Sequence, residues 1–178
     1  DSRAGNAAVS TAEGLTVGIV GIGSVVSDAI AGGTLSYAPS NAYTSDTLST
    51  AIASGTTVTA DGVRVETSAL NDAWSHTQAA GYSAFNSAGT DSSAISAQTI
   101  NASIAGNITA VHDIQVTGQS TGDAFADAVA ENISLIGTIG KSTANARMAP
   151  TLSVTSGPNT HLTAGGGVVF LANHTTTD

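Results

Sequence analysis

The chain has 178 residues, of which 41% are hydrophobic, 10% are charged, 4% are aromatic and none is cysteine. The absence of cysteine excludes disulfides and thiolate metal sites. A net charge of −9 argues against a nucleic-acid surface, which needs clustered lysine and arginine. The hydrophobic content with so few charges favours an ordered protein, and the small aromatic share predicts a thin core of small and β-branched side chains.

The first part of the chain contains its most apolar window, which glycine interrupts. This window, Leu15 to Ile22, contains Gly18 and Gly21 and is far shorter than the roughly 18 residues of a membrane-spanning helix. The glycines imitate a dinucleotide-binding turn, but Val26 stands where the third glycine of that motif must be. We therefore expect neither a membrane span nor a nucleotide site here.

Residues 37–47 interrupt the pattern of β-branched residues. This stretch brings Tyr37, Pro39 and Tyr43 together with serine, asparagine and aspartate, which are typical of turns and loops. We predict an insertion that loops out of the regular fold.

A short phrase then occurs three times. It consists of an apolar residue, Thr-Ala, a turn and an alternating strand, and it fills residues 58–65, 108–116 and 162–170. The copies are about fifty residues apart, a period typical of solenoids, propellers and repeat arrays. If the copies stack, equivalent residues align along one axis and point into the core, and these are Val58, Ala60, Ile108, Ala110, Leu162 and Ala164.

Small residues alternate with larger ones after the first two phrases. They are Ala73, Ser75, Thr77 and Ala79 after the first copy, and Ala124, Ala126, Ala128 and Ala130 after the second. Strict alternation places such side chains on one face of a strand, whereas a helix would scatter them. We therefore predict strands here, although alanine alone would favour a helix.

The order of the segments predicts that the chain opens and closes within a repeat. Residues 5–19 resemble the half-repeat that ends near Gly137, and residues 168–178 supply the half that should precede them. We expect residues 1–178 to form a single segment of about three degenerate repeats, each made of two coils of about 20–25 residues. Joining Asp178 to another Asp1 would then restore the repeat order.

Three stretches resemble the degenerate repeats of very large bacterial surface β-solenoid adhesins, such as filamentous-haemagglutinin-like proteins and autotransporter passenger domains. They are TTVTADGVRVETSA, GNITAVHDIQVTGQSTGDAFADAVAENISLIG and THLTAGGGVVFLANHTTTD. The resemblance implies an all-β fold, a parallel right-handed β-helix, that is exported to the cell surface. The alternative fold is a β-sandwich pilin-like subunit completed by a donated strand, which would show antiparallel hairpins.

The function that this resemblance implies is structural. We expect a segment of an extracellular fibre or cell-surface adhesin stalk that stacks end to end with further repeats or subunits. The alternative is a carbohydrate-binding or carbohydrate-active β-helix, with glycans as partners. We expect an extracellular or cell-surface location, no nucleic-acid partner, no membrane insertion, no enzymatic activity and no cofactor, with Ca²⁺ kept as an alternative.

Three kinds of candidate site follow from individual residues. Trp74, flanked by Asp72 and His76, combines an aromatic ring with a carboxylate and forms the best glycan or interface patch. Four Asn-x-Ser/Thr sequons permit glycosylation, at Asn101, Asn107, Asn132 and Asn173. Asp61, Asp113 and the glycine turn 165–167 would offer oxygen ligands to Ca²⁺ if their turns stack, although such residues also serve simply as turn formers.

Overall fold

The computed structural model describes residues 2–31, 33–35 and 43–176. These ranges form β-strands and no helix, so the all-β expectation is confirmed. The largest sheet holds β1 (Ser2–Ala31), β5 (Val63–Ser96), β8 (Ile114–Thr121), β9 (Ala124–Met148) and β12 (Val168–Thr175). The second sheet holds β2 (Gly33–Leu35), β3 (Tyr43–Ile52), β6 (Gln98–Ile104) and β10 (Thr151–Ser156), and the third holds β4 (Thr57–Ala60), β7 (Asn107–Ala110) and β11 (His161–Ala164).

The three sheets are built from parallel pairs. In the first sheet β5 pairs in parallel with β1, β8 and β9. In the second sheet β6 pairs in parallel with β3 and β10, and in the third β7 pairs in parallel with β4 and β11. β2 and β3 form an antiparallel pair. The prediction of parallel sheets is therefore confirmed. The β-sandwich alternative is wrong for the described residues, because the phrase strands that it would arrange in hairpins lie parallel.

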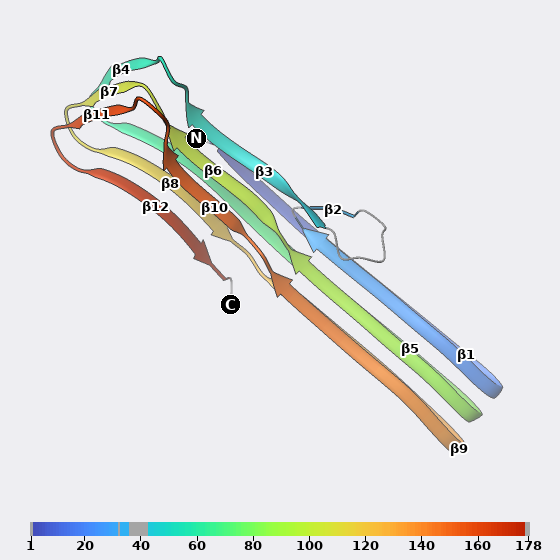
Figure 1. The fold of residues 1–178 in the computed structure, drawn as a ribbon. Helices are drawn as coiled ribbons and strands as arrows, with labels where there is room; N and C mark the ends of the chain where they lie inside the picture. Colours follow the sequence, from blue (N-terminus) through green and yellow to red (C-terminus); the bar gives the residue numbers. More distant parts are fainter. Residues whose placement is uncertain (1, 32, 36–42, 177–178) are drawn as a thin grey trace.

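The chain visits the three sheets in turn and then repeats the circuit, and we call each circuit a pass (Figure 1). The first pass contains β1 to β4, the second β5 to β7 and the third β8 to β11, and β12 begins a fourth. Val63 pairs with Ile114, and Ile114 pairs with Val168, so each residue pairs with its equivalent in the next copy of the phrase. One sequence repeat is therefore one pass, and the expectation of two coils in each repeat is wrong.

A pass takes so much of the chain because β1, β5 and β9 each bend back on themselves. Ser92 Oγ donates to Ser75 Oγ over 2.8 Å although both lie in β5, 17 residues apart. The bend in β5 lies near Phe85, where the register with β9 shifts. The outgoing and returning halves form two layers, which we call the arm, and the arms extend away from β4, β7 and β11 (Figure 1).

The first pass contains an insertion near the predicted position. Ser2 pairs with Thr67 and Asp46 pairs with Gln98, so the chain between Ser2 and Asp46 is longer than the equivalent stretch of the second pass. Residues 36–42, which include most of the predicted loop 37–47, lie outside the described residues. The rest of that range, 43–47, belongs to β3 and pairs with β2 and β6, so this part of the loop prediction is wrong.

The interior of the arm is narrow and largely polar. Ala73, Ser75, Thr77 and Ala79 are all buried, as their alternation predicted, and residues between them face outward. Thr77 Oγ1 donates to the carbonyl of Asp91 over 3.1 Å, and Ser75 Oγ donates to that of Ser27 over 2.8 Å. Hydroxyl groups can bridge the two layers directly because the layers lie so close, and this closeness excludes large side chains.

The apolar core lies at the opposite end of each pass. Here the strands surround buried isoleucine and valine side chains, and the cluster comprises Val65, Ala102, Ile104, Ile108, Ala110, Ile114 and Val116. β4, β7 and β11 close this end, which holds the bulkiest fully buried side chains among the described residues. Burial of apolar surface is concentrated here, while the arm relies on close packing and hydrogen bonds.

We expect Ala73→Leu to lower the free energy of unfolding by about 1–3 kcal/mol, because the added methylene groups overpack the interior of the arm. Ala73 is 2% exposed and packs against Ala31 and Ala94. The control, Ala80→Leu, lies on the outward face of the same strand and should change stability by no more than about 0.5 kcal/mol. Denaturant unfolding curves measure both, and equal losses would contradict the assignment of faces.

Candidate functional site

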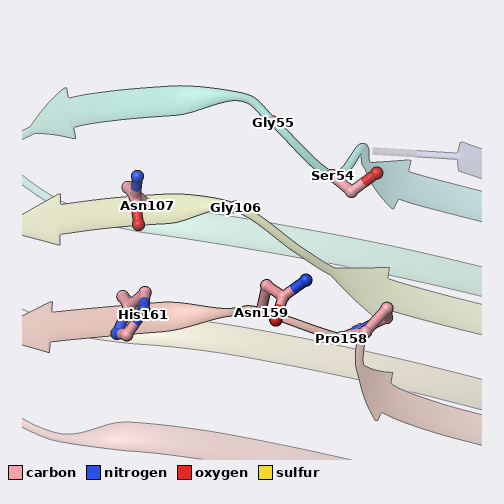
Figure 2. A pocket seen from close by; sticks show the side chains of 7 residues that line it. All are labelled: Ser54, Gly55, Gly106, Asn107, Pro158, Asn159 and His161. Atoms are coloured by element: carbon pink, nitrogen blue, oxygen red, sulfur yellow. The ribbon is translucent and has the colours of Figure 1, made fainter.

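The turns between the second and third sheets form a column at one corner of the molecule (Figure 2). Gly55, Gly106 and Asn159 adopt φ angles of 78°, 95° and 54°, a left-handed conformation that glycine and asparagine tolerate best. An open hollow of ≈ 490 Å³ lies over the column and is lined by Ser54, Gly55, Gly106, Asn107, Pro158, Asn159 and His161. These lining residues include one histidine, His161, and no carboxylate, so they supply no acid–base pair.

Backbone hydrogen bonds connect each turn to the next. The N–H of Asn107 donates to the carbonyl of Thr56 over 2.9 Å, and the N–H of His161 donates to that of Gly106 over 2.9 Å. A Cβ on Gly106 would lie 2.2 Å from the Thr56 oxygen. Glycine is therefore required at this level of the column both for its φ angle and for the close approach of the neighbouring turn.

The six residues predicted to stack lie in register in the third sheet. Val58 and Leu162 both pair with Ile108, which is 1% exposed, and both pack against the apolar core. Ala110 is buried in the same cluster, and its partners Ala60 and Ala164 are half-buried. The structure thus brings all six predicted residues together on one side of the core.

The predicted aromatic patch lies on the outer face of the arm. Trp74 is 38% exposed, and its ring stacks on that of Phe125 in the next pass, with 6.3 Å between the ring centroids and 7° between the planes. The His76 ring lies 5.8 Å from the indole at 12°. Sequence reasoning did not include Phe125, although its place one repeat after Trp74 was the available signal.

The carboxylates around this patch connect successive passes. Asp72 Oδ1 accepts a hydrogen bond from the backbone N–H of Asp123 over 3.1 Å. His76 Nδ1 lies 3.0 Å from Asp127 Oδ2, and His112 Nδ1 lies 3.1 Å from Asp61 Oδ1 at the core end. Each of these three contacts joins residues one repeat apart, so these carboxylates link successive passes rather than converging on a cleft.

The four sequons occupy different environments. Asn107 and Asn173 are exposed, and Asn101 is half-buried on β6. Asn132 Oδ1 accepts a hydrogen bond from Asn86 Nδ2 over 2.9 Å, so its amide is engaged within the arm. The side chains at 107 and 173 are therefore the most accessible of the four to a modifying enzyme.

The residues considered for Ca²⁺ do not form a common cage in the described structure. Asp113 Oδ1 accepts a hydrogen bond from the Gly167 N–H over 2.7 Å, while Asp61 is paired with His112. No group of three or more acidic, histidine or cysteine side chains with metal-binding geometry occurs among the described residues. The side chains of Asp61 and Asp113 serve here as turn partners.

The far end of the arm exposes a group of apolar side chains that sequence reasoning missed. We call this end the tip: residues 15–22 of β1, 81–87 of β5 and 132–139 of β9. Its exposed large side chains are Leu15, Val17, Ile19, Val20, Ile22, Tyr82, Phe85, Ile133, Leu135, Ile136 and Ile139. The available signal was the apolar window around Gly18 and Gly21, which occurs again at 133–139.

Comparisons with models of protein families, with curated proteins and with solved structures found no match. The likeness to surface β-solenoid adhesins therefore stays a prediction. In the described part of the chain, no helix has the length and apolar character needed to cross a membrane.

We expect Gly106→Ala to be clearly more destabilising than Gly55→Ala. Both substitutions place a Cβ at positive φ, which costs about 1–2 kcal/mol. Nothing lies within 4 Å of a Cβ on Gly55, whereas Gly106→Ala also displaces the Thr56 carbonyl from the turn column. Thermal and denaturant unfolding compare the two variants. Equal losses would show that the turns do not stack as described.

We expect Asp28→Asn to reduce the dependence of stability on pH in mildly acidic solution. Partial desolvation of its carboxyl group, and secondarily the Asp91 carboxylate, raise the pKa of Asp28 above its ordinary value of 3.8. The folded state then keeps a proton that the unfolded state has lost, so this contribution to stability is present at low pH and disappears as pH rises through the raised pKa. Unfolding curves of the wild type and variant that stay parallel from pH 3.8 upward would contradict this assignment.

Proposed function

We propose that the protein is a structural segment of an extracellular fibre or cell-surface adhesin stalk, folded as a right-handed β-solenoid. The observation that carries the proposal is the register between passes: residues about one repeat apart pair in parallel in all three sheets. Such a fold adds passes along one axis, and each pass buries its inner face mainly against its neighbours.

The use of the polar residues supports a structural role over a carbohydrate-active one. A glycoside hydrolase needs two free carboxyl groups across a groove. Asp72 and Asp127 instead contact groups in the neighbouring pass, and Trp74 stacks on two rings. These side chains reinforce the pairing of passes, which is what a stalk requires.

The two ends of the stack have edges that match each other. Among the described residues, the outermost strands on one side are β1, β2, β4 and the part of β3 that β2 does not cover. The outermost strands on the other side are β9, β10, β11 and β12. Val63 pairs with Ile114 and Ile114 with Val168, so residues 168–171 of β12 occupy the positions equivalent to 63–66, two passes further on. The exposed edge of β12 therefore has the register in which β5 and β8 accept their own neighbours.

The register corrects one expectation about how copies would join. Ser2 pairs with Thr67, Thr67 with Gly118 and Gly118 with Ala172, so Ser2 and Ala172 occupy equivalent positions. Direct linkage of residue 178 to residue 1 would therefore duplicate a short stretch instead of restoring the repeat. We propose that copies stack through their strand edges, with one of the two overlapping stretches displaced.

The proposed location is the cell surface or the extracellular space, and the proposed partners are further repeats or copies. A chain without cysteine, with a net charge of −9 and with stability spread over repeated parallel pairing suits an exposed, elongated polymer. The similarity of the phrase repeats to surface adhesins supports the same location.

We expect the purified chain to form filaments or end-linked aggregates, and Phe170→Pro to block them. Ile114 donates its N–H to Gly167, so in a parallel ladder the N–H of Val169 faces β8 and that of Phe170 faces the open edge. Val169→Pro would instead weaken the attachment of β12 to β8, because it removes a donor that faces β8. Light scattering and negative-stain microscopy distinguish the variants.

The control for this experiment is Val111→Lys, which adds a charge at an exposed position in a turn outside the strands. It should leave filaments intact. A wild-type chain that stays monomeric at high concentration, and that scatters light no more than Phe170→Pro, would refute end-to-end assembly of the segment.

A further inference from the structure

The tip is the largest group of exposed apolar side chains in the described structure. It spans β1 and β9, which are outermost strands, and β5 between them, where Tyr82 and Phe85 are 45% and 50% exposed although strands lie on both sides. Leu135 is 92% exposed and Ile19 is 81% exposed. Patches of this kind, bordered by polar residues, mark interaction sites in soluble proteins.

The tip rows follow the register of the passes. Val17, Tyr82 and Ile133 form one row of partners, and Ile22, Ser87 and Ile139 form another. Neighbours within a row are separated by the spacing of β-strands, about 4.8 Å. Val17, Tyr82 and Ile133 therefore form an apolar ridge with the period of the passes, whereas Ser87 interrupts the second row.

The tip also differs from the remainder of the chain in charge. Residues 15–22, 81–87 and 132–139 contain no acidic or basic residue, although the chain carries 13 acidic residues and a net charge of −9. The nearest charged neighbours along the chain are mostly acidic: Glu13, Asp28, Asp91 and Glu131, with Lys141 as the exception. Two copies can therefore meet at their tips with the least repulsion between their charges.

We propose that the tip is a self-association surface, which joins two copies of this chain side by side through their arms. A second copy related by a twofold axis presents a ridge with the same period, so the side chains of the two tips interdigitate like the dry faces of paired sheets. A bilayer or an unrelated protein offers no such period, and the acidic border disfavours an anionic membrane. In a fibre the contact repeats with every pass, which would bundle fibres laterally.

The experiment uses the chain with Phe170→Pro, so that end-to-end growth does not obscure lateral pairing, together with the wild type. Sedimentation velocity over a range of concentrations should show reversible dimers. Ile19→Lys combined with Leu135→Lys should raise the dissociation constant by at least about tenfold, since the contact would bury charges without partners. Val111→Lys, at a position 65% exposed near the core end, should leave the dimer unchanged.

A second variant tests the geometry without adding charge. The chain contains no cysteine, so Leu135→Cys supplies a single thiol at the tip. Mild oxidation should produce covalent dimers of Leu135→Cys much faster than of Val111→Cys. Circular dichroism and melting curves verify that each variant is folded.

Three results would overturn the proposal. They are a Phe170→Pro chain that is monomeric at every concentration, a dimer that Ile19→Lys with Leu135→Lys leaves unchanged, and equal crosslinking of the two cysteine variants. Flotation of a monomeric chain with phosphatidylcholine vesicles, abolished by the lysine variants, would assign the tip to a lipid surface instead. A wild-type chain that forms tip dimers but no filaments would refute the proposed end-to-end stacking while leaving this inference intact.

Discussion

The distance between the two layers of the arm constrains the rest of the structure. Ser92 donates to Ser75, Ser75 donates to Ser27, and the hydroxyl of Ser27 in turn bonds to that of Ser10, so these serines join two layers and two passes. Layers close enough for hydroxyl contact admit alanine, serine, threonine and glycine and exclude leucine and aromatic rings. The closeness of the layers explains why small residues are so common in the chain. Large aliphatic side chains are therefore found at the core end and on the outer face of the arm.

Larger polar side chains inside the arm need a gap opposite them. Asn86 is buried, and a Cβ on Gly81 would lie within the space of its amide group. Its Nδ2 reaches Asn132 in the next pass, 2.9 Å away. Gly81 thus leaves the space that the Asn86 side chain occupies. Asn71 is also buried, and its amide contacts Gln98, which contacts Ser120.

Much of the register could be predicted from sequence, but the length of a pass could not. The phrase at Val58, Ile108 and Leu162 indicated which residues stand beside each other, because an apolar residue before Thr-Ala is the same local signal in each copy. The alternation at Ala73–Ala79 indicated the inward face. No comparable signal marks the bend near Phe85: the alternation of small residues continues on both sides, and a strand that turns back on itself reads like a longer strand. The predicted aromatic site was incomplete for a similar reason, since Phe125 becomes a neighbour of Trp74 only through the pairing of passes.

The two ends of a pass meet different physical requirements. At the core end, isoleucine burial and the backbone bonds between stacked turns resist change, so substitutions at Ile108 or Gly106 act on stability. At the tip, large apolar side chains lie outside a narrow polar interior and contribute little to folding. Apolar side chains that do not fill the core are available for contact with another molecule. The narrow interior of the arm excludes bulky side chains and leaves them at its far end, so the residues that stabilise the fold differ from those of the association surface that we propose.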